Sequence, residues 1–294
     1  MTDSTSDHLR LDKREVRRSF EHAASSYDAA AVLQREVGTR MLERLDYIKC
    51  VPQCVLDVGS GTGGGADLRR RYPQAQVVAL DFALAMLRQA RPSGWRQWLP
   101  WSPVPAQVCA DFEHLPIRER SVDMVWSNFA LQWSDDPRVA FAEVLRVLKP
   151  QGLFMFSTFG PDTLRELREA YLGIDGYAHV SRFFDMHDLG DMLLQCGFAD
   201  PVMDVERFTL TYAEVLDLMR ELKAIGARNA TQGRRRGLTG KGVLQAVVRN
   251  YETMRRDGRL PATYEVVYGH AWKPRPRVSA DGRQIVHFDP RRRA

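Results

Sequence analysis

The sequence predicts an α/β fold: a mainly parallel, seven-stranded sheet with helices on both faces and a helical insertion near its end. Short apolar runs alternate with helix-like segments between residues 54 and 159. These runs are apolar almost throughout, which is typical of parallel strands buried on both faces. The stretch "VLDVGSGTGGG" contains the end of the first run and a glycine-rich turn. It precedes a helix-like segment, as in the first strand–turn–helix unit of such folds.

The elements of the N-terminal half follow from periodicity. Residues 13–46 are expected to form a helix, because apolar residues recur three and four positions apart between Val32 and Leu45. Proline and tryptophan crowd residues 91–105, where we expect an irregular inserted loop. Strands are predicted at 54–58, 76–80, 106–110, 122–127 and 152–159, and helices at 63–71, 82–90 and 136–148.

The C-terminal half changes order after the fifth strand. A hairpin would suffice to join the last two strands, so the long segment between them is expected to form a helical lid over the strand ends. From residue 273 onward proline and arginine dominate, which favours disorder. Helices are predicted at 161–171, 185–196, 212–226 and 239–256, and strands at 202–209 and 262–272.

Phosphate ligands fit the glycine-rich turn only in part. A P-loop needs a lysine to neutralise phosphate, and no lysine occurs between Lys49 and Lys149. A dinucleotide site needs the spacing G-x-G-x-x-G, which Gly59, Gly61 and Gly64 satisfy. The first alternative is thereby excluded, and the second depends on the charges around the glycines.

Asp57 distinguishes the remaining ligands. It lies two positions before Gly59 and begins a D-x-G-x-G-x-G pattern through Gly61 and Gly63. A carboxylate there would repel a pyrophosphate, but it suits an ammonium group. The pattern therefore favours S-adenosylmethionine, which carries an ammonium and a sulfonium and no phosphate. A strand–turn–helix without any ligand is the alternative.

Other strand ends supply further candidate contacts, since ligands of open α/β sheets lie outside the carboxyl ends of the strands. Asp81 is expected to accept hydrogen bonds from the ribose diol, with Phe82 next to it. Asp111 could accept from the adenine amino group while Phe112 covers the ring. Asn128 is expected beside the methyl-donor end. For Asp111, an aspartate that only shapes the strand-end turn is the alternative.

Composition limits the environment. The net charge is +5, and arginine runs concentrate in the last third, as solvated faces or as a surface for an acidic partner. No apolar run approaches the roughly 18 residues of a membrane helix, and the polar start is neither a signal peptide nor a convincing transit peptide. The four cysteines lack metal-ligand spacing. We expect a cytoplasmic protein with reduced thiols, no metal and no membrane partner.

The central motifs "VLDVGSGTG", "VVALD", "ADFEHLP" and "LKPQG" resemble class I S-adenosylmethionine-dependent methyltransferases over about residues 50–158. The resemblance implies a Rossmann-like fold. The organisation expected is an N-terminal helical segment capping the active site, the cofactor-binding core, the lid insertion, the last core strand and a basic tail: 1–46, 47–210, 211–260, 261–273 and 274–294.

The flanking segments "RRSFEHAASSYDAAAVLQREV", "HVSRFF" and "ARNATQGRRRGLTGK" resemble the malonyl-acyl-carrier-protein O-methyltransferases of biotin synthesis, up to about residue 273. That family methylates the free carboxylate of a malonyl thioester, on acyl carrier protein or on CoA, and so initiates pimeloyl synthesis. "FGPDTLRELR" and "PATYEVVYGHAWK" also resemble the arginine hydroxylase-like assembly factor of respiratory complex I, which binds the same cofactor without methyl transfer. "ARNATQGRRRGLTGK" favours the biotin family.

The implied reaction needs no general base, because a carboxylate is already ionised at neutral pH. Tyr27 is expected to orient the attacking carboxylate through one hydrogen bond; a tyrosine that only packs the helix is the alternative. Arg182 is expected to anchor the malonyl group, with Lys223 as its rival. The alternative for Arg182 is a salt bridge between its loop and the lid.

The arginine-rich lid is expected to recognise the acidic carrier protein through Arg234, Arg235, Arg236 and Lys241. A nucleic-acid methyltransferase would use the same basic region for phosphate contact. Against that alternative, no Asn-Pro-Pro-Tyr/Phe-type motif follows the strand at 122–127, and no aromatic residues interleave the arginine runs. The sequence therefore argues against a nucleic-acid partner.

Overall fold

The computed structural model describes residues 10–90, 106–235, 237 and 239–276. The expected loop at 91–105, most of the expected disordered tail, and Arg236 among the expected carrier-protein contacts lie outside the described residues.

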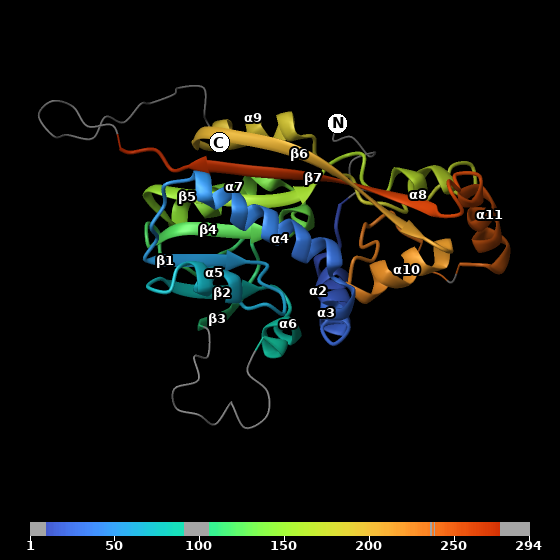
Figure 1. Ribbon diagram of the computed structural model, residues 1–294, viewed down its shortest axis with the longest axis horizontal. Coiled ribbons are helices and arrows are strands. Elements are labelled where there is room, and N and C mark those ends of the chain that lie inside the picture. The colour runs from blue at the N-terminus through green and yellow to red at the C-terminus, as the bar shows by residue number, and fades with distance from the viewer. Residues whose placement is uncertain (1–9, 91–105, 236, 238, 277–294) are drawn as a thin grey trace, which may run out of the picture.

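Seven strands form one sheet in the order β3-β2-β1-β4-β5-β7-β6 (Figure 1). The neighbours from β3 to β5 run parallel, and β7 is antiparallel to both β5 and β6. This confirms the predicted fold class. The strands are β1 (Cys54–Val58), β2 (Gln76–Asp81), β3 (Ala106–Cys109), β4 (Val122–Asn128), β5 (Leu148–Phe159), β6 (Ala199–Tyr212) and β7 (Leu260–Trp272).

The strand order reverses at β1. The chain moves outward from β1 to β3 and then returns to pair β4 against the free side of β1. A crevice for a ligand is expected outside the carboxyl ends of β1 and β4, because the connections leave these two strands in opposite directions.

Helices cover both faces of the sheet. Neighbouring strand residues such as Val55 and Leu56 are both fully buried, yet they belong to two separate hydrophobic cores. One core includes side chains of α4 (Val32–Arg44) and α5 (Ala66–Arg71), and the other those of α7 (Pro137–Val147) and α9 (Met186–Cys196). This two-sided burial explains why the strand sequences lack alternating polar positions.

The single helix predicted for residues 13–46 is wrong. The segment forms α2 (Lys13–Ala23), α3 (Tyr27–Ala30) and α4, followed by the 3₁₀ turn η1 (Leu45–Tyr47). The chain leaves helical geometry at Ala31, with φ −79° and ψ 51°. Ser26 Oγ donates to the carbonyl of Ala23 at 3.1 Å and to that of Ala224 at 2.9 Å. Ser26, in the turn between α2 and α3, thus ties the N-terminal segment to a helix far along the chain. Periodicity cannot indicate such a contact.

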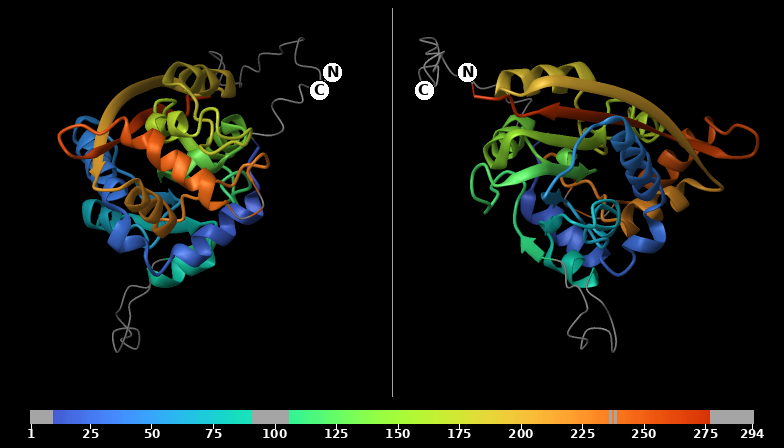
Figure 2. Two further views of the ribbon diagram at one scale, coloured as in Figure 1. Left: turned by 90° about the vertical axis from the view of Figure 1, so that its right-hand side faces the viewer. Right: turned by 60° about the vertical axis from the view of Figure 1, so that its left-hand side comes forward.

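The last two strands, β6 and β7, extend beyond the ends of the other strands of the sheet. β6 was predicted only for 202–209, but it continues to Tyr212 and remains paired with β7 along that extension. Its far end meets α8 (Arg165–Ala170), α10 (Val215–Ala224) and α11 (Lys241–Glu252), at the right of Figure 1. In the left view of Figure 2 these helices lie in front of the strand ends, where α10 also contacts α3. The remaining short helices are α6 (Leu84–Gln89) and η3 (Leu131–Trp133).

Candidate active site

The glycine-rich turn after β1 is shaped for close approach. Gly59 and Gly61 have φ of +73° and +54°, which favours glycine. A Cβ on Gly59 would lie 2.4 Å from the Cβ of Ala130, so no larger residue fits there. The backbone N–H groups of Gly59 and Ser60 donate to the Leu80 carbonyl at 2.8 and 3.0 Å. The turn is therefore held against the end of β2 with its backbone open to a ligand.

Asp81 lies at the end of β2 and closes this turn. Its Oδ2 accepts a hydrogen bond from Gly61 N–H at 2.9 Å, and its Oδ1 accepts one from Ala83 N–H at 2.8 Å. Burial raises the pKa of Asp81 to about 6, although these two N–H groups oppose the shift. Each oxygen retains a lone pair, so the carboxylate can still accept bonds from a ligand diol.

Asp57, on β1, is the second buried carboxylate of the turn, 7% exposed. Burial and, next, the negative charge of Asp81 raise the pKa of Asp57 to about 7. Asp57, Gly59, Gly61 and Gly63 line one hollow together with Tyr27. An ammonium group bound there would relieve both causes of the shift, because it supplies the missing opposite charge.

An adjoining pocket contains the other predicted strand-end residues. Asp81, Phe82, Asp111 and Phe112 line it, and α2 forms one of its walls. Asp111 Oδ1 accepts from Glu113 N–H at 3.0 Å and from Lys13 Nζ at 3.2 Å. These bonds hold the carboxylate in place and tie α2 to the rim of the pocket.

Asn128 also lines this pocket, but both ends of its side-chain amide already have protein partners. Nδ2 donates to the Gln34 carbonyl at 2.9 Å, and Oδ1 accepts from Ser157 Oγ at 2.7 Å. The side chain fastens α4 to β4 and β5. Its predicted contact with the cofactor stays a prediction.

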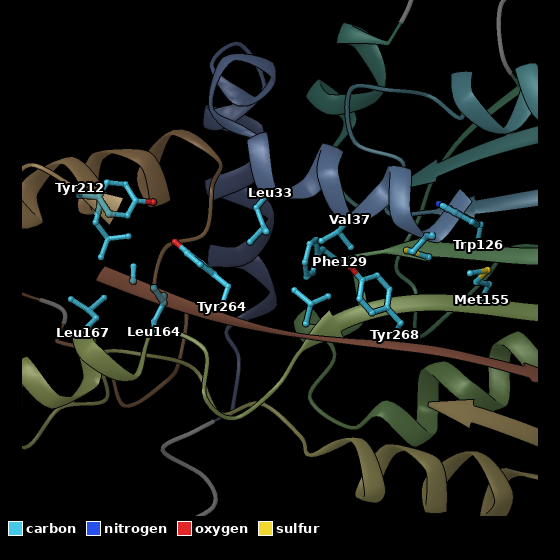
Figure 3. Close-up of a cluster of buried hydrophobic side chains, with 14 of the residues drawn as sticks. Leu33, Val37, Trp126, Phe129, Met155, Leu164, Leu167, Tyr212, Tyr264 and Tyr268 are labelled. Carbon is cyan, nitrogen blue, oxygen red and sulfur yellow. The ribbon is translucent and has the colours of Figure 1, made fainter. Parts of the chain in front are cut away.

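A second, mostly apolar cavity opens beside the first. Phe20, Tyr27, Phe129 and Trp133 line both, so the two spaces meet at these four side chains. Figure 3 shows a cluster of buried hydrophobic side chains from separate elements, several of which also line the second cavity. Among its lining residues are Leu33 from α4, Phe129 after β4, Leu164 and Leu167 at α8, and Tyr264 from β7.

Tyr27 lines all three spaces, and its predicted role in orienting the carboxylate stays a prediction. Burial and, next, the Asp81 carboxylate raise the pKa of Tyr27 above its ordinary value. The phenol therefore stays protonated and can donate a hydrogen bond at neutral pH.

The cations predicted for the malonyl group, Arg182 and Lys223, do not line the second cavity, and their roles stay predictions. Arg182 is exposed and lines a neighbouring surface hollow, and Lys223 is exposed on α10. Within the described part of the chain, Arg228 is the arginine or lysine that lines the second cavity. Arg228 is exposed as well, and sequence reasoning did not single it out, because no local pattern marks one arginine among many as lining a cavity.

The predicted carrier-protein cations also differ in their surroundings. Arg234 makes an ion pair with Asp12 at 3.3 Å, with 18% of its side chain exposed, and its guanidinium donates to the Thr231 carbonyl at 3.0 Å. Arg235 is half-buried, and Lys241 is exposed at the start of α11.

The described residues lack two features. None of their helices is long and apolar enough to cross a membrane. The same residues contain no group of three or more His, Cys, Asp or Glu side chains placed to hold a metal ion. Cys50, Cys54 and Cys109 are free thiols.

Residues 56–156 match the family model of the methyltransferase domain. The crystal structure of the YcgJ protein from Bacillus subtilis shares the fold, with a TM-score of 0.56 at 16% identity, over 80% of this chain and 98% of that one. The chain is a class I S-adenosylmethionine-dependent methyltransferase, and the predicted cofactor is confirmed.

Closer relatives define the family. The malonyl-[acyl-carrier protein] O-methyltransferase of Gallionella capsiferriformans is 57% identical, over 94% of this chain and 96% of that protein. The protein of the same name from Laribacter hongkongensis is 58% identical, over 95% and 96%. The chain belongs to the malonyl-[acyl-carrier protein] O-methyltransferase family, as its flanking segments predict. The complex I assembly-factor alternative is not supported.

Proposed function

We propose that this chain methylates the free carboxylate of the malonyl group on acyl carrier protein, giving the methyl ester. The observation that carries this proposal is the high identity to malonyl-[acyl-carrier protein] O-methyltransferases over nearly the whole chain, including the lid. The apolar cavity that meets the cofactor pocket at Tyr27 supports it. We also propose a cytoplasmic location and, from the family resemblance, that the ester initiates pimeloyl synthesis for biotin.

The residues around the turn fit S-adenosylmethionine. Gly59 and Gly61 leave room for close approach of the methionine part. Asp57 would pair with the ammonium group, and Asp81 would accept from the ribose hydroxyls. Asp111 would accept from the adenine amino group, with Phe82 and Phe112 supplying apolar contact.

When bound, the cofactor supplies a methyl group activated by a sulfonium. The protein need not supply a base, because the carboxylate of the substrate is ionised at neutral pH. The protein acts by aligning the reacting groups, which can lower the activation barrier by roughly 7–11 kcal/mol in favourable cases. The Tyr27 hydroxyl would hold one carboxylate oxygen, and the apolar walls around Phe129 and Tyr264 would exclude water, which otherwise stabilises the charged reactants.

Transfer of labelled methyl groups tests the proposal. The purified protein is incubated with methyl-labelled S-adenosylmethionine and malonyl-acyl carrier protein. Acetyl-acyl carrier protein, malonyl-CoA and RNA serve as comparisons. We expect a base-labile methyl ester on malonyl-acyl carrier protein and no label on the acetyl form or on RNA. Cofactor binding without any transfer to malonyl thioesters would contradict the proposed function.

A further inference from the structure

A surface hollow adjoins the apolar cavity on the outside of the fold. Its members include Leu172, Tyr177 and Arg182. It shares His179, Val180, Ser181 and Phe183 with the inner cavity, so residues 179–183 separate an outer space from an inner one. A substrate carried on a long flexible arm would need a passage past this segment, because its carrier is too large to enter.

Specific contacts fix the inner wall of this passage. His179 Nε2 donates to Asp175 Oδ1 at 2.6 Å, and the imidazole stacks on Tyr171 with 3.5 Å between ring centroids. The Asn229 amide donates to the Ala178 carbonyl and so ties the segment to the loop after α10. These contacts hold residues 178 and 179 in place against their neighbours.

The other side of the passage is aromatic. Phe183 packs against Phe159 with ring centroids 5.6 Å apart, and Phe159 stacks on Phe129 at 4.3 Å. Phe129 lines both the inner cavity and the cofactor pocket. A continuous apolar wall thus runs from the outer hollow to the point where the two inner spaces meet.

The rim of the hollow combines exposed apolar and cationic side chains. Leu172 is 70% exposed and Tyr177 is 48% exposed, both high for large apolar side chains. Arg168 and Arg182 supply exposed positive charge, and carbonyls of Pro161 and Thr163 hold the Arg168 guanidinium in place.

The carboxylates of the hollow are mostly occupied. Asp175 binds His179, and Asp185 caps α9 by accepting from His187 N–H at 2.8 Å. Asp188 is the exposed carboxylate of the hollow. An acidic partner therefore meets two arginines and two apolar side chains beside one exposed aspartate.

We propose that acyl carrier protein docks over this hollow and that its malonyl-bearing arm enters between His179 and Phe183. The inference rests on the proposed function. It moves the docking surface away from the arginine run of the lid, where the ion pair with Asp12 already engages Arg234. Exposed Arg182 would then attract the carrier, and Leu172 and Tyr177 would pack against it.

Three charge reversals test the docking surface: Arg182→Glu at the hollow, Lys241→Glu at the rival lid surface, and Arg249→Glu as a matched control. Arg249 is an exposed cation on α11. Initial rates are measured with malonyl-acyl carrier protein and with malonyl-pantetheine, which has the arm without the protein. Cofactor affinity and melting temperature verify folding.

We expect Arg182→Glu to raise KM for malonyl-acyl carrier protein at least fivefold more than KM for malonyl-pantetheine, and the excess to shrink at high salt. Tyr177→Ser should act in the same direction without the salt dependence, and Arg249→Glu should leave both KM values unchanged. A carrier-specific defect in Lys241→Glu but not in Arg182→Glu would overturn the inference. Equal losses on both substrates in Arg182→Glu would also overturn it. If the unaltered protein methylates neither malonyl substrate, the proposed function itself fails.

Discussion

Binding of S-adenosylmethionine should depend steeply on pH, because two buried carboxylates of the ligand-free site titrate near neutrality. The pKa of Asp57 is raised to about 7 and that of Asp81 to about 6. The ammonium and the diol of the cofactor both favour ionised carboxylates. The ligand should therefore bind the form in which both groups have lost their protons, and binding should release protons below pH 7.

The magnitude follows from the ionised fractions. Between pH 7.5 and 5.5 the share of protein with both carboxylates ionised falls about 100-fold, so the Kd should rise about 100-fold. At pH 6.5 about three-quarters of Asp57 and one-quarter of Asp81 are protonated, so about one proton should be released for each cofactor bound.

Calorimetry in buffers of different ionisation enthalpy measures both the Kd and the proton release. Asp57→Asn should weaken binding at pH 7.5 and reduce the change in Kd down to pH 5.5 to about fourfold, because only Asp81 then titrates. Asp191→Asn, an exposed carboxylate on α9, is the control and should keep the full profile. A flat profile with no proton release in the unaltered protein would refute the reasoning.

The stability of the folded protein should depend on pH in the opposite direction from cofactor binding. A carboxyl whose pKa is raised in the folded state contributes stability at low pH and loses it as the pH rises through that pKa. The ligand-free protein should therefore lose stability between about pH 4 and pH 7 from Asp57, and saturating cofactor should remove that loss.

Three further predictions concern individual side chains. Asp81→Asn should weaken cofactor binding by about 10- to 150-fold, since hydrogen bonds to a charged group contribute about 1.5–3 kcal/mol; unchanged calorimetric affinity in the folded variant would remove its assigned role. Tyr27→Phe keeps the ring, so kcat should fall about tenfold or more, about 1.4 kcal/mol, with cofactor affinity within about twofold; full kcat would leave Tyr27 a packing residue. Arg228→Met should lower malonyl turnover more than Lys223→Met does, because Arg228 lines the cavity; the reverse order would return the anchor to Lys223.

The sheet and the cofactor turn could be predicted from sequence because they depend on neighbours in the chain. Continuous apolar runs report burial on both faces wherever a strand lies inside a parallel sheet. The turn carries its own constraint: the positive φ of Gly59 and its closeness to Ala130 require glycine. Strand-end acids such as Asp81 then follow from topology, since the carboxyl ends of parallel strands meet at one edge.

The second, apolar cavity could not be predicted in this way, because segments far apart in sequence form it. Phe20 and Tyr27 come from the N-terminal helices, whereas Ile225 and Arg228 come from the end of α10 and the loop after it. Gly226 lies where these two regions pack together. Its φ is +77°, and a Cβ at this position would lie 3.0 Å from the Phe20 ring. Which arginine faces the cavity is decided by that long-range packing, so Arg228 and Arg182 could not be distinguished by spacing.

The same packing connects the N-terminal helices to both the cofactor pocket and the second cavity. Lys13 pairs with Asp111 at the rim of the cofactor pocket, and Ser26 binds the Ala224 carbonyl at the end of α10. The N-terminal helices thus contact both the rim of the cofactor pocket and the end of α10 beside the second cavity. Since Phe20 and Tyr27 line both spaces, each ligand should protect the other from exchange with solvent. Productive alignment thus requires α2 and α3 to be docked against both the core and the lid.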